Sequence, residues 1–172
     1  DELAGVIFSA VEQKRVKIYN ERKREISLDS IKYAGVNYPV TSIAGIAFDN
    51  CCRISSIIIG NNITSIDGLF DDCTELTSLV VGKKVASICS EAFFFCENLN
   101  FVKTLATTPP TLGQNVFSYD IDTLIVPCGT MNNYMSTNWN YYWDPMFNSI
   151  IIEETSINEI ITATINEGEI YT

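Results

Sequence analysis

The chain has 172 residues, 47% of them hydrophobic, which is enough to fill the core of one ordinary domain and excludes global disorder. It contains no histidine, which excludes Ser-His-Asp and Cys-His catalysis and removes the commonest transition-metal ligand. Its 21 acidic and 11 basic residues give a net charge of −10, which argues against sequence-independent binding of nucleic acid.

Residues 1–40 predict a β-rich cap at the amino-terminal end of the fold. Two β-rich runs, Gly5–Phe8 and Val16–Tyr19, flank a charged turn, and Ile26–Leu28 alternates apolar and polar residues as a half-buried strand does. Residues 1–32 also hold seven of the eleven basic residues. The rest of the chain therefore has four bases against fifteen acids, a net charge of −11.

Residues 41–127 contain a repeating unit in which an alanine or leucine, a phenylalanine and, three residues later, a cysteine recur. The phenylalanine and cysteine pairs are Phe48 and Cys51, Phe70 and Cys73, and Phe93 and Cys96. Successive pairs are 22 and then 23 residues apart. A fixed period in the low twenties predicts a leucine-rich-repeat solenoid, so we expect function on a stacked surface rather than in one catalytic pocket.

Each repeat predicts a short strand and a short helical turn on opposite sides of the solenoid. In a strand such as Ser78–Val81, alternate side chains point into the core and to solvent. Gly60 and Gly82 follow two of these strands and are expected to allow tight turns. The Phe-x-x-Cys segment is expected to form one helical turn.

The carboxy-terminal part predicts a second cap. Leu124–Val126 is expected to be the last strand of the repeats, and residues 128–152 are rich in aromatic residues. These are Tyr134, Trp139, Tyr141, Tyr142, Trp143 and Phe147. Because the end of a solenoid exposes an apolar cross-section, we interpret this segment as an aromatic cap. Residues 153–172 are acidic and predict a tail or an edge hairpin, within one structural domain overall.

Three stretches agree in order with one known family. They are an entry at Gly35–Ile43, a repeat with the pattern V-T-S-I-x-x-x-A-F-x-x-C starting at Val40, and an exit that runs from Thr107 to Ile150 and includes Tyr134 and Trp139. These stretches resemble the BspA-like leucine-rich repeats of bacterial surface proteins. The resemblance implies a secreted or surface-exposed protein of a host-associated bacterium, with adhesion or host-protein binding as its role. It supplies no catalytic residues and no cofactor.

The resemblance also bears on location. The chain opens with Asp1-Glu2-Leu3, without a methionine or an apolar signal region, and we interpret it as mature or trimmed, with its signal and anchor outside this chain. It contains no run of about 18 apolar residues that would predict a membrane span.

The cysteines and carboxylates offer only weak metal or catalytic sites. Equivalent thiols of stacked repeats point the same way, so we expect Cys51, Cys73 and Cys96 to form a column of buried free thiols rather than disulfides. No C-x-x-C pair is present for zinc. The acidic group of Asp71, Asp72 and Glu75 lacks a calcium-binding spacing. The carboxylate pair of Asp120 and Asp122 lacks the enclosure that glycoside hydrolysis needs. We therefore predict no enzyme, no metal and no cofactor.

Two surfaces are candidates for binding a partner. The outward strand positions place Ile58, Val80, Phe101 and Ile125 on one face, with Lys103 beside them, and they predict an apolar ridge or scattered apolar surface. At the carboxy-terminal end, Tyr141 and Tyr142 predict either a sugar-stacking or protein-anchoring cluster or, like Trp139, part of the cap.

These surfaces support three hypotheses. The first is a non-enzymatic, adhesin-like module that binds extracellular or host proteins through the ridge. The second is a carbohydrate-binding accessory module, which would need at least two coplanar, exposed aromatic rings. The third is a structural spacer that displays other domains.

Overall fold

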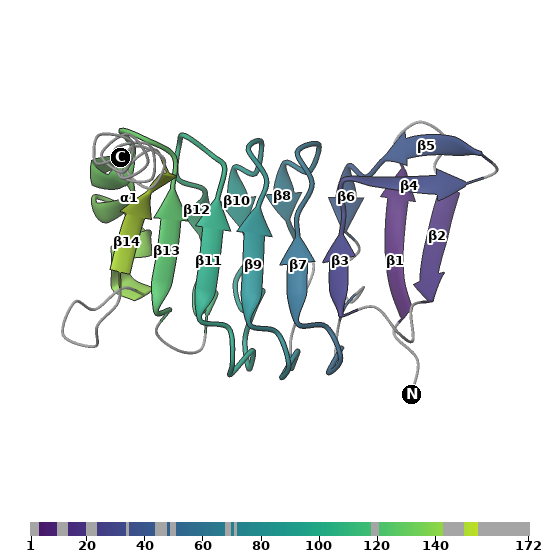
Figure 1. The fold of residues 1–172 in the computed structure, drawn as a ribbon, viewed down its shortest axis with the longest axis horizontal. Coiled ribbons are helices and arrows are strands. Elements are labelled where there is room, and N and C mark those ends of the chain that lie inside the picture. Colours follow the sequence, from purple (N-terminus) through teal and green to yellow (C-terminus); the bar gives the residue numbers. More distant parts are fainter. Residues whose placement is uncertain are drawn as a thin grey trace, which may run out of the picture.

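The computed structural model describes residues 4–9, 14–19, 24–33, 35–43, 48, 51–67, 70, 72–117, 121–142 and 150–154. Its main feature is a six-stranded sheet in which every neighbouring pair of strands is parallel (Figure 1). In spatial order the strands are β3 (Glu25–Ser27), β7 (Ser56–Ile58), β9 (Ser78–Val81), β11 (Phe101–Thr104), β13 (Thr123–Val126) and β14 (Ile150–Glu153). Each of these strands belongs to one rung of a solenoid, as the repeat spacing predicts.

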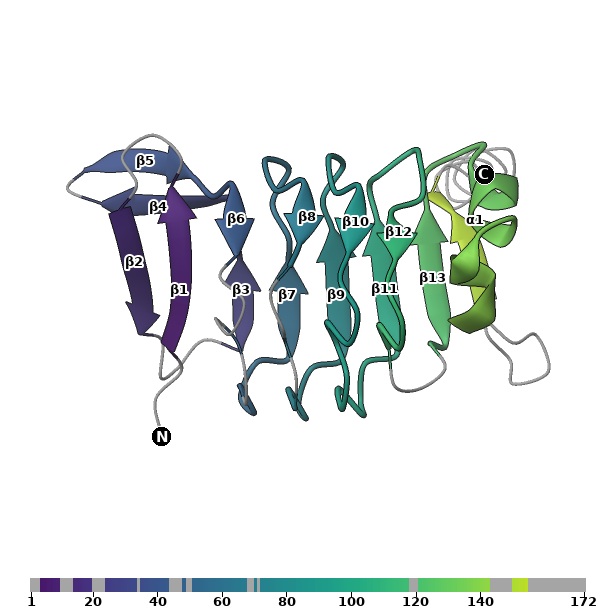
Figure 2. The ribbon, with the colours of Figure 1, turned by 180° about the vertical axis from the view of Figure 1, so that it is seen from behind.

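A second, narrower sheet lies behind the first. It contains the parallel two-residue strands β8 (Ser65–Ile66), β10 (Ser87–Ile88) and β12 (Thr111–Leu112). In the reverse view of Figure 2, these strands lie nearer the viewer than the main sheet. The Phe-x-x-Cys segment of the third repeat follows β10 as a single hydrogen-bonded turn. In this turn, the Cys96 N–H donates to the Phe93 carbonyl at 3.3 Å. The backbone at Phe95, with φ of 56°, ends that turn before a helix can form.

The strands expected near the amino terminus are present. β1 (Ala4–Ser9) pairs antiparallel with β2 (Lys14–Tyr19) and with β6 (Ser42–Ile43), and β4 (Ser30–Tyr33) forms a hairpin with β5 (Val36–Pro39). β3 differs from the others because it pairs parallel with β7 and so belongs to the main sheet. The stacked strands therefore begin inside the segment that the sequence assigned to a cap. The domain boundaries at residues 40, 127 and 152 stay predictions.

The core is a set of columns in which equivalent side chains lie one above the next. The rings of Phe48 and Phe70 are 4.9 Å apart, and those of Phe70 and Phe93 are 5.0 Å apart, with interplanar angles of 9° and 8°. Phe117 continues the column at 5.7 Å from Phe93, although its repeat has lost the cysteine. The predicted stacking of phenylalanines is therefore confirmed, and it extends one rung further than the Phe-Cys motif.

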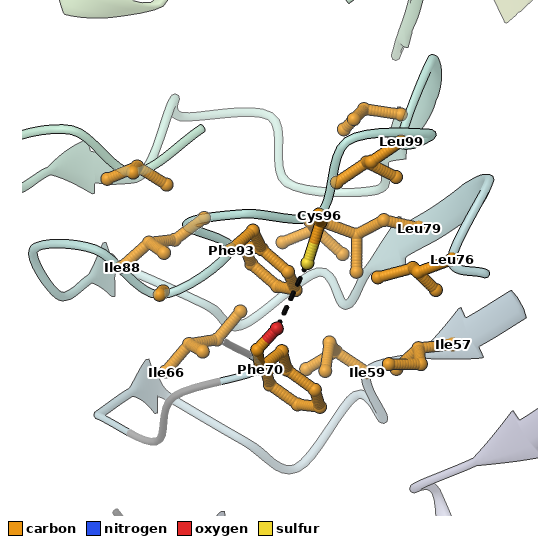
Figure 3. Close-up of a cluster of buried hydrophobic side chains, with 14 of the residues drawn as sticks. Ile57, Ile59, Ile66, Phe70, Leu76, Leu79, Ile88, Phe93, Cys96 and Leu99 are labelled. Atoms are coloured by element: carbon orange, nitrogen blue, oxygen red, sulfur yellow. Dashed lines mark hydrogen bonds between the residues drawn. The ribbon is translucent and has the colours of Figure 1, made fainter. Parts of the chain in front are cut away.

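The cysteines form a second column beside the rings. Cys51, Cys73 and Cys96 are buried and form no disulfide, as predicted. The Cys96 thiol donates to the Phe70 carbonyl at 3.0 Å (Figure 3), and the Cys73 thiol donates to the Phe48 carbonyl at 3.2 Å. The Cys73 and Cys96 thiols thus each satisfy a buried carbonyl of the preceding rung, which is a role that a purely apolar side chain could not take.

Gly60 and Gly82 have a second role besides the expected tight turns, which begin at these residues. The Ile63 N–H donates to the Gly60 carbonyl and the Val85 N–H donates to the Gly82 carbonyl, each at 3.2 Å. Neither glycine has a left-handed φ, which among the described glycines is found at Gly35 and Gly129. A Cβ on Gly82 would lie 2.4 Å from the Gly60 carbonyl oxygen, and a Cβ on Gly60 would lie 2.3 Å from the Leu28 carbonyl oxygen. These glycines are therefore needed for the close approach of neighbouring rungs as well as for starting a tight turn.

Aromatic side chains of the carboxy-terminal segment pack onto the last rungs. The segment contains α1 (Met131–Met135) and the 3₁₀ helix η1 (Asn138–Tyr142), which place Tyr134 and Trp139 in the core. The Trp139 ring lies 6.1 Å from that of Phe117, and its Nε1 donates to the Pro110 carbonyl at 2.7 Å. None of the helices in the described part of the chain has the length and apolar character of a membrane span.

Tyr134 joins this segment to a polar position in the core. Thr104 stands in an inward position of β11, next to Val81 in register, and is fully buried. The Thr104 and Tyr134 hydroxyl oxygens are 2.7 Å apart, and the Tyr134 hydroxyl donates to the Ala106 carbonyl at 2.7 Å. Burial raises the pKa of Tyr134 to about 12, so the neutral hydroxyl that donates this bond is retained.

The last described strand, β14, pairs parallel with β13 and extends the main sheet. The predicted hairpin within residues 153–172 lies outside the described residues except for its first two positions.

A carboxylate at the end of β14 gives a testable pH dependence. The Glu153 carboxylate accepts from the Met131 N–H at 3.0 Å, and this bond, with that of the Gly129 N–H, holds the pKa of Glu153 below its ordinary value of 4.5. A lowered folded-state pKa stabilises the fold above the unfolded-state pKa, and this stabilisation is lost as the pH falls through the folded-state value. We expect E153Q to unfold at a lower temperature than wild type at neutral pH, with the difference shrinking as the pH falls below 4.5. Thermal unfolding followed by circular dichroism at several pH values measures this, and a difference that is independent of pH would contradict it.

Candidate functional site

The outward face of the six-stranded sheet carries two parallel rows of side chains, which the strand register defines. The first row, here called the apolar row, contains Ser27, Ile58, Val80, Lys103, Ile125 and Ile152. The second row contains Glu25, Ser56, Ser78, Phe101, Thr123 and Ile150. Ile58 is 42% exposed, and Val80, Phe101 and Ile125 are half-buried.

One part of the predicted ridge is wrong. Phe101 does not lie between Val80 and Ile125, because its partners in register are Ser78 and Thr123. Lys103 takes the place in the apolar row that was predicted for Phe101. The reason is that residues two apart on a strand share a face but lie about 6–7 Å apart along it. Ile152 on β14 extends the apolar row by one strand that the sequence did not predict.

Lys103 contributes less charge to this face than its position suggests. Its Nζ lies 2.6 Å from the Glu154 carboxylate oxygen Oε1, so the ion pair spans β13 from β11 to the end of β14. An ion pair this exposed adds little to stability, but it neutralises the one cation in the row. The lysine stem then adds apolar surface between Val80 and Ile125.

The two tyrosines of the other candidate surface have separate environments. Tyr141 is 83% exposed, whereas Tyr142 is buried, with its ring 5.2 Å from Phe117 and its hydroxyl accepting from the Val116 N–H at 3.0 Å. The prediction that Tyr142 is available to a partner is therefore wrong. The two tyrosine rings lie at 87° to each other.

Tyr141 and Tyr142 line a shallow hollow of about 320 Å³ together with Gly113, Gln114, Asn115 and Asn138. Only the Tyr141 ring is widely exposed there, so this hollow does not have the coplanar pair of rings that the carbohydrate hypothesis needs. Trp143, which the sequence grouped with these rings, lies outside the described residues.

The remaining candidates form no site in the described part of the chain. There, no group of three or more His, Cys, Asp or Glu side chains lies close enough together to hold a metal ion. Asp71 and Asp120, which belong to the two carboxylate groups weighed above, lie outside the described residues. Among the cysteines off the column, Cys52 and Cys128 are exposed and Cys89 is half-buried, and all three are free.

This geometry is that of a leucine-rich-repeat solenoid. The family model described as "BspA type Leucine rich repeat region" matches residues 17–123 in six copies, so the chain belongs to the BspA-type leucine-rich repeat family. The match begins in β2 and includes β3, which agrees with the position of β3 in the main sheet. No curated protein matches this chain in sequence.

Two solved structures share the fold. One is a leucine-rich repeat protein from Bacteroides ovatus, which is 22% identical with a TM-score of 0.56 and matches 76% of this chain. The other is a leucine rich cell surface protein from Faecalibacterium prausnitzii, which is 21% identical with a TM-score of 0.51 and matches 83% of this chain. This chain covers 35% and 40% of those two chains.

Proposed function

We propose that this protein is a non-enzymatic module of the bacterial cell surface that binds extracellular proteins of a host through the outward face of its six-stranded sheet. The observation that carries the proposal is the apolar row. Ile58 and Val80 are neighbours in register, and Ile58 is 42% exposed. Figure 1 shows this face with no other described element crossing it. Apolar side chains that gather on an open, preformed surface favour association with another protein.

The surface location rests on the family and on the cell-surface protein from Faecalibacterium prausnitzii, whose fold this chain shares. Since the chain covers less than half of either solved relative, the module is proposed as one part of a larger binding protein. The net charge of −10 disfavours nucleic acid as the partner.

The test introduces carboxylates into the apolar row. We expect the double variant I58D/V80D to lose at least about tenfold in affinity for any purified extracellular-matrix protein that the wild type binds, because a buried unpaired charge is costly at an interface. Surface plasmon resonance against a panel of such proteins measures this.

The matched control is V36D. Val36 is an aliphatic strand residue that is 52% exposed on β5, outside the six-stranded sheet. This variant adds the same kind of charge and should keep the wild-type affinity. Equal losses in V36D and I58D/V80D, or binding that neither variant changes, would contradict a role of the sheet face.

The variant F101A helps to distinguish the spacer hypothesis from the binding hypothesis. Phe101 lies beside the apolar row and its ring is half-buried, so a partner that covers the face would contact it. Wild-type affinity for every panel protein in both F101A and I58D/V80D would favour a spacer that only displays other domains.

A further inference from the structure

In the second and third repeats, one residue of the turn has a left-handed backbone. Asp72 and Phe95 directly precede Cys73 and Cys96, and their φ angles are 55° and 56°. Aspartate and asparagine tolerate this conformation, and Asn50 stands at the same place in the first repeat of the sequence. For a bulky aromatic residue the conformation is an outlier. Phe95 is therefore a residue of a type that the left-handed backbone of this turn disfavours.

The Phe95 ring is not placed to stabilise the core. It is 47% exposed, whereas the Phe93 ring is fully buried in the phenylalanine column. The Phe95 ring lies 4.2 Å from that of Phe94, at an interplanar angle of 55°. An exposed aromatic ring on a strained backbone is a feature that clusters at functional sites.

Acidic residues occur in the same turn as these two rings and in the adjoining turn of the preceding rung. The Asp72 N–H donates to the Phe94 carbonyl at 3.1 Å, and the Phe94 N–H donates to the Glu91 carbonyl at 3.2 Å. In the adjoining turns, the Asn98 side chain donates to the Thr74 carbonyl at 2.7 Å, so the turns that contain Glu75 and Glu97 are neighbours. The acidic side chains of these turns are exposed or half-buried, and they are Asp72, Glu75, Glu91 and Glu97. Residues 72–75 and 91–98 contain no lysine or arginine.

We infer that Phe94 and Phe95, here called the aromatic turn, form a second docking surface for a cationic protein segment. Apolar side chains of the partner pack on the Phe95 ring, and flanking lysine or arginine side chains pair with the carboxylates of this turn and the adjoining one. Exposed aromatic anchors dominate many interfaces, and opposite charges around them speed association and select the partner. The aromatic turn lies outside the six-stranded sheet, so this inference does not depend on the proposed function.

The test uses random peptides of about twelve residues displayed on phage and panned against the wild-type chain at low salt. We expect enriched peptides to combine apolar residues with two or more lysines or arginines. Their affinity should fall at least about tenfold for F95N and should weaken as NaCl rises from about 0.05 M to about 0.5 M. E91Q/E97Q should weaken binding at low salt, because it removes two charges and retains the side-chain shapes.

Two controls separate this role from a structural one. Because asparagine accepts the left-handed backbone, F95N should unfold at the wild-type temperature or above it. I58D/V80D, which changes only the sheet face, should bind the peptides as the wild type does. The inference is overturned if no peptide is enriched, if enriched peptides lack basic residues or bind F95N equally well, or if F95N unfolds at a clearly lower temperature.

Discussion

Replacing Phe70 by alanine is expected to lower the free energy of unfolding by about 3–5 kcal/mol. Phe70 is fully buried, and its ring stacks between those of Phe48 and Phe93 at 4.9 and 5.0 Å. The truncation removes both ring contacts and leaves a cavity. The two neighbouring rings cannot close this cavity, because the strands on either side hold the spacing of their rungs.

Chemical denaturation by urea, followed by far-UV circular dichroism, measures this loss. Tyr141→Ala is the control, since that ring is 83% exposed and its removal should change the free energy of unfolding by less than about 0.5 kcal/mol. F70L should recover part of the loss, because leucine fills some of the space. A loss below about 1 kcal/mol for F70A would show that the ring column does not carry the stability of the stack.

The ring column was predictable because the repeat period and the stacking period are the same physical quantity. Residues one period apart must lie one rung apart, so Phe48, Phe70 and Phe93 could be placed from their spacing alone. The same spacing gives the register of the outward rows. The error at Phe101 came from treating the two outward positions of a strand as one row, although they lie side by side.

Other features depend on contacts that spacing does not encode. Tyr141 and Tyr142 are adjacent in the sequence, but the side chains of successive residues in a 3₁₀ helix point about a third of a turn apart. Tyr141 is therefore exposed while Tyr142 is buried. Thr104 looks like a polar defect among the buried inward positions of the strands until Tyr134, thirty residues later in the sequence, supplies the partner for its hydroxyl. The strain at Phe95 likewise becomes visible only with the backbone angles.

Gly82→Ala is expected to lower the free energy of unfolding by at least about 3 kcal/mol, although it adds a single methyl group. In Gly82 the added Cβ would meet backbone atoms of the preceding rung, at 2.4 Å from the Gly60 oxygen and 2.7 Å from the Ile59 oxygen. Backbone atoms cannot rotate away as a side chain can. The rungs must therefore move apart, which lengthens the parallel hydrogen bonds between β7 and β9.

Gly35→Ala separates this steric cost from the ordinary cost of replacing a glycine. A Cβ on Gly35 would meet nothing within 4 Å, but its φ of +84° disfavours alanine by about 1–2 kcal/mol. Urea denaturation of both variants should therefore rank Gly82→Ala as the more destabilising one, even though alanine suits the Gly82 backbone better. The reverse order would mean that the rungs separate easily at this point. In that case the close approach of Gly60 and Gly82 would not be what sets the spacing between neighbouring strands of the proposed docking face.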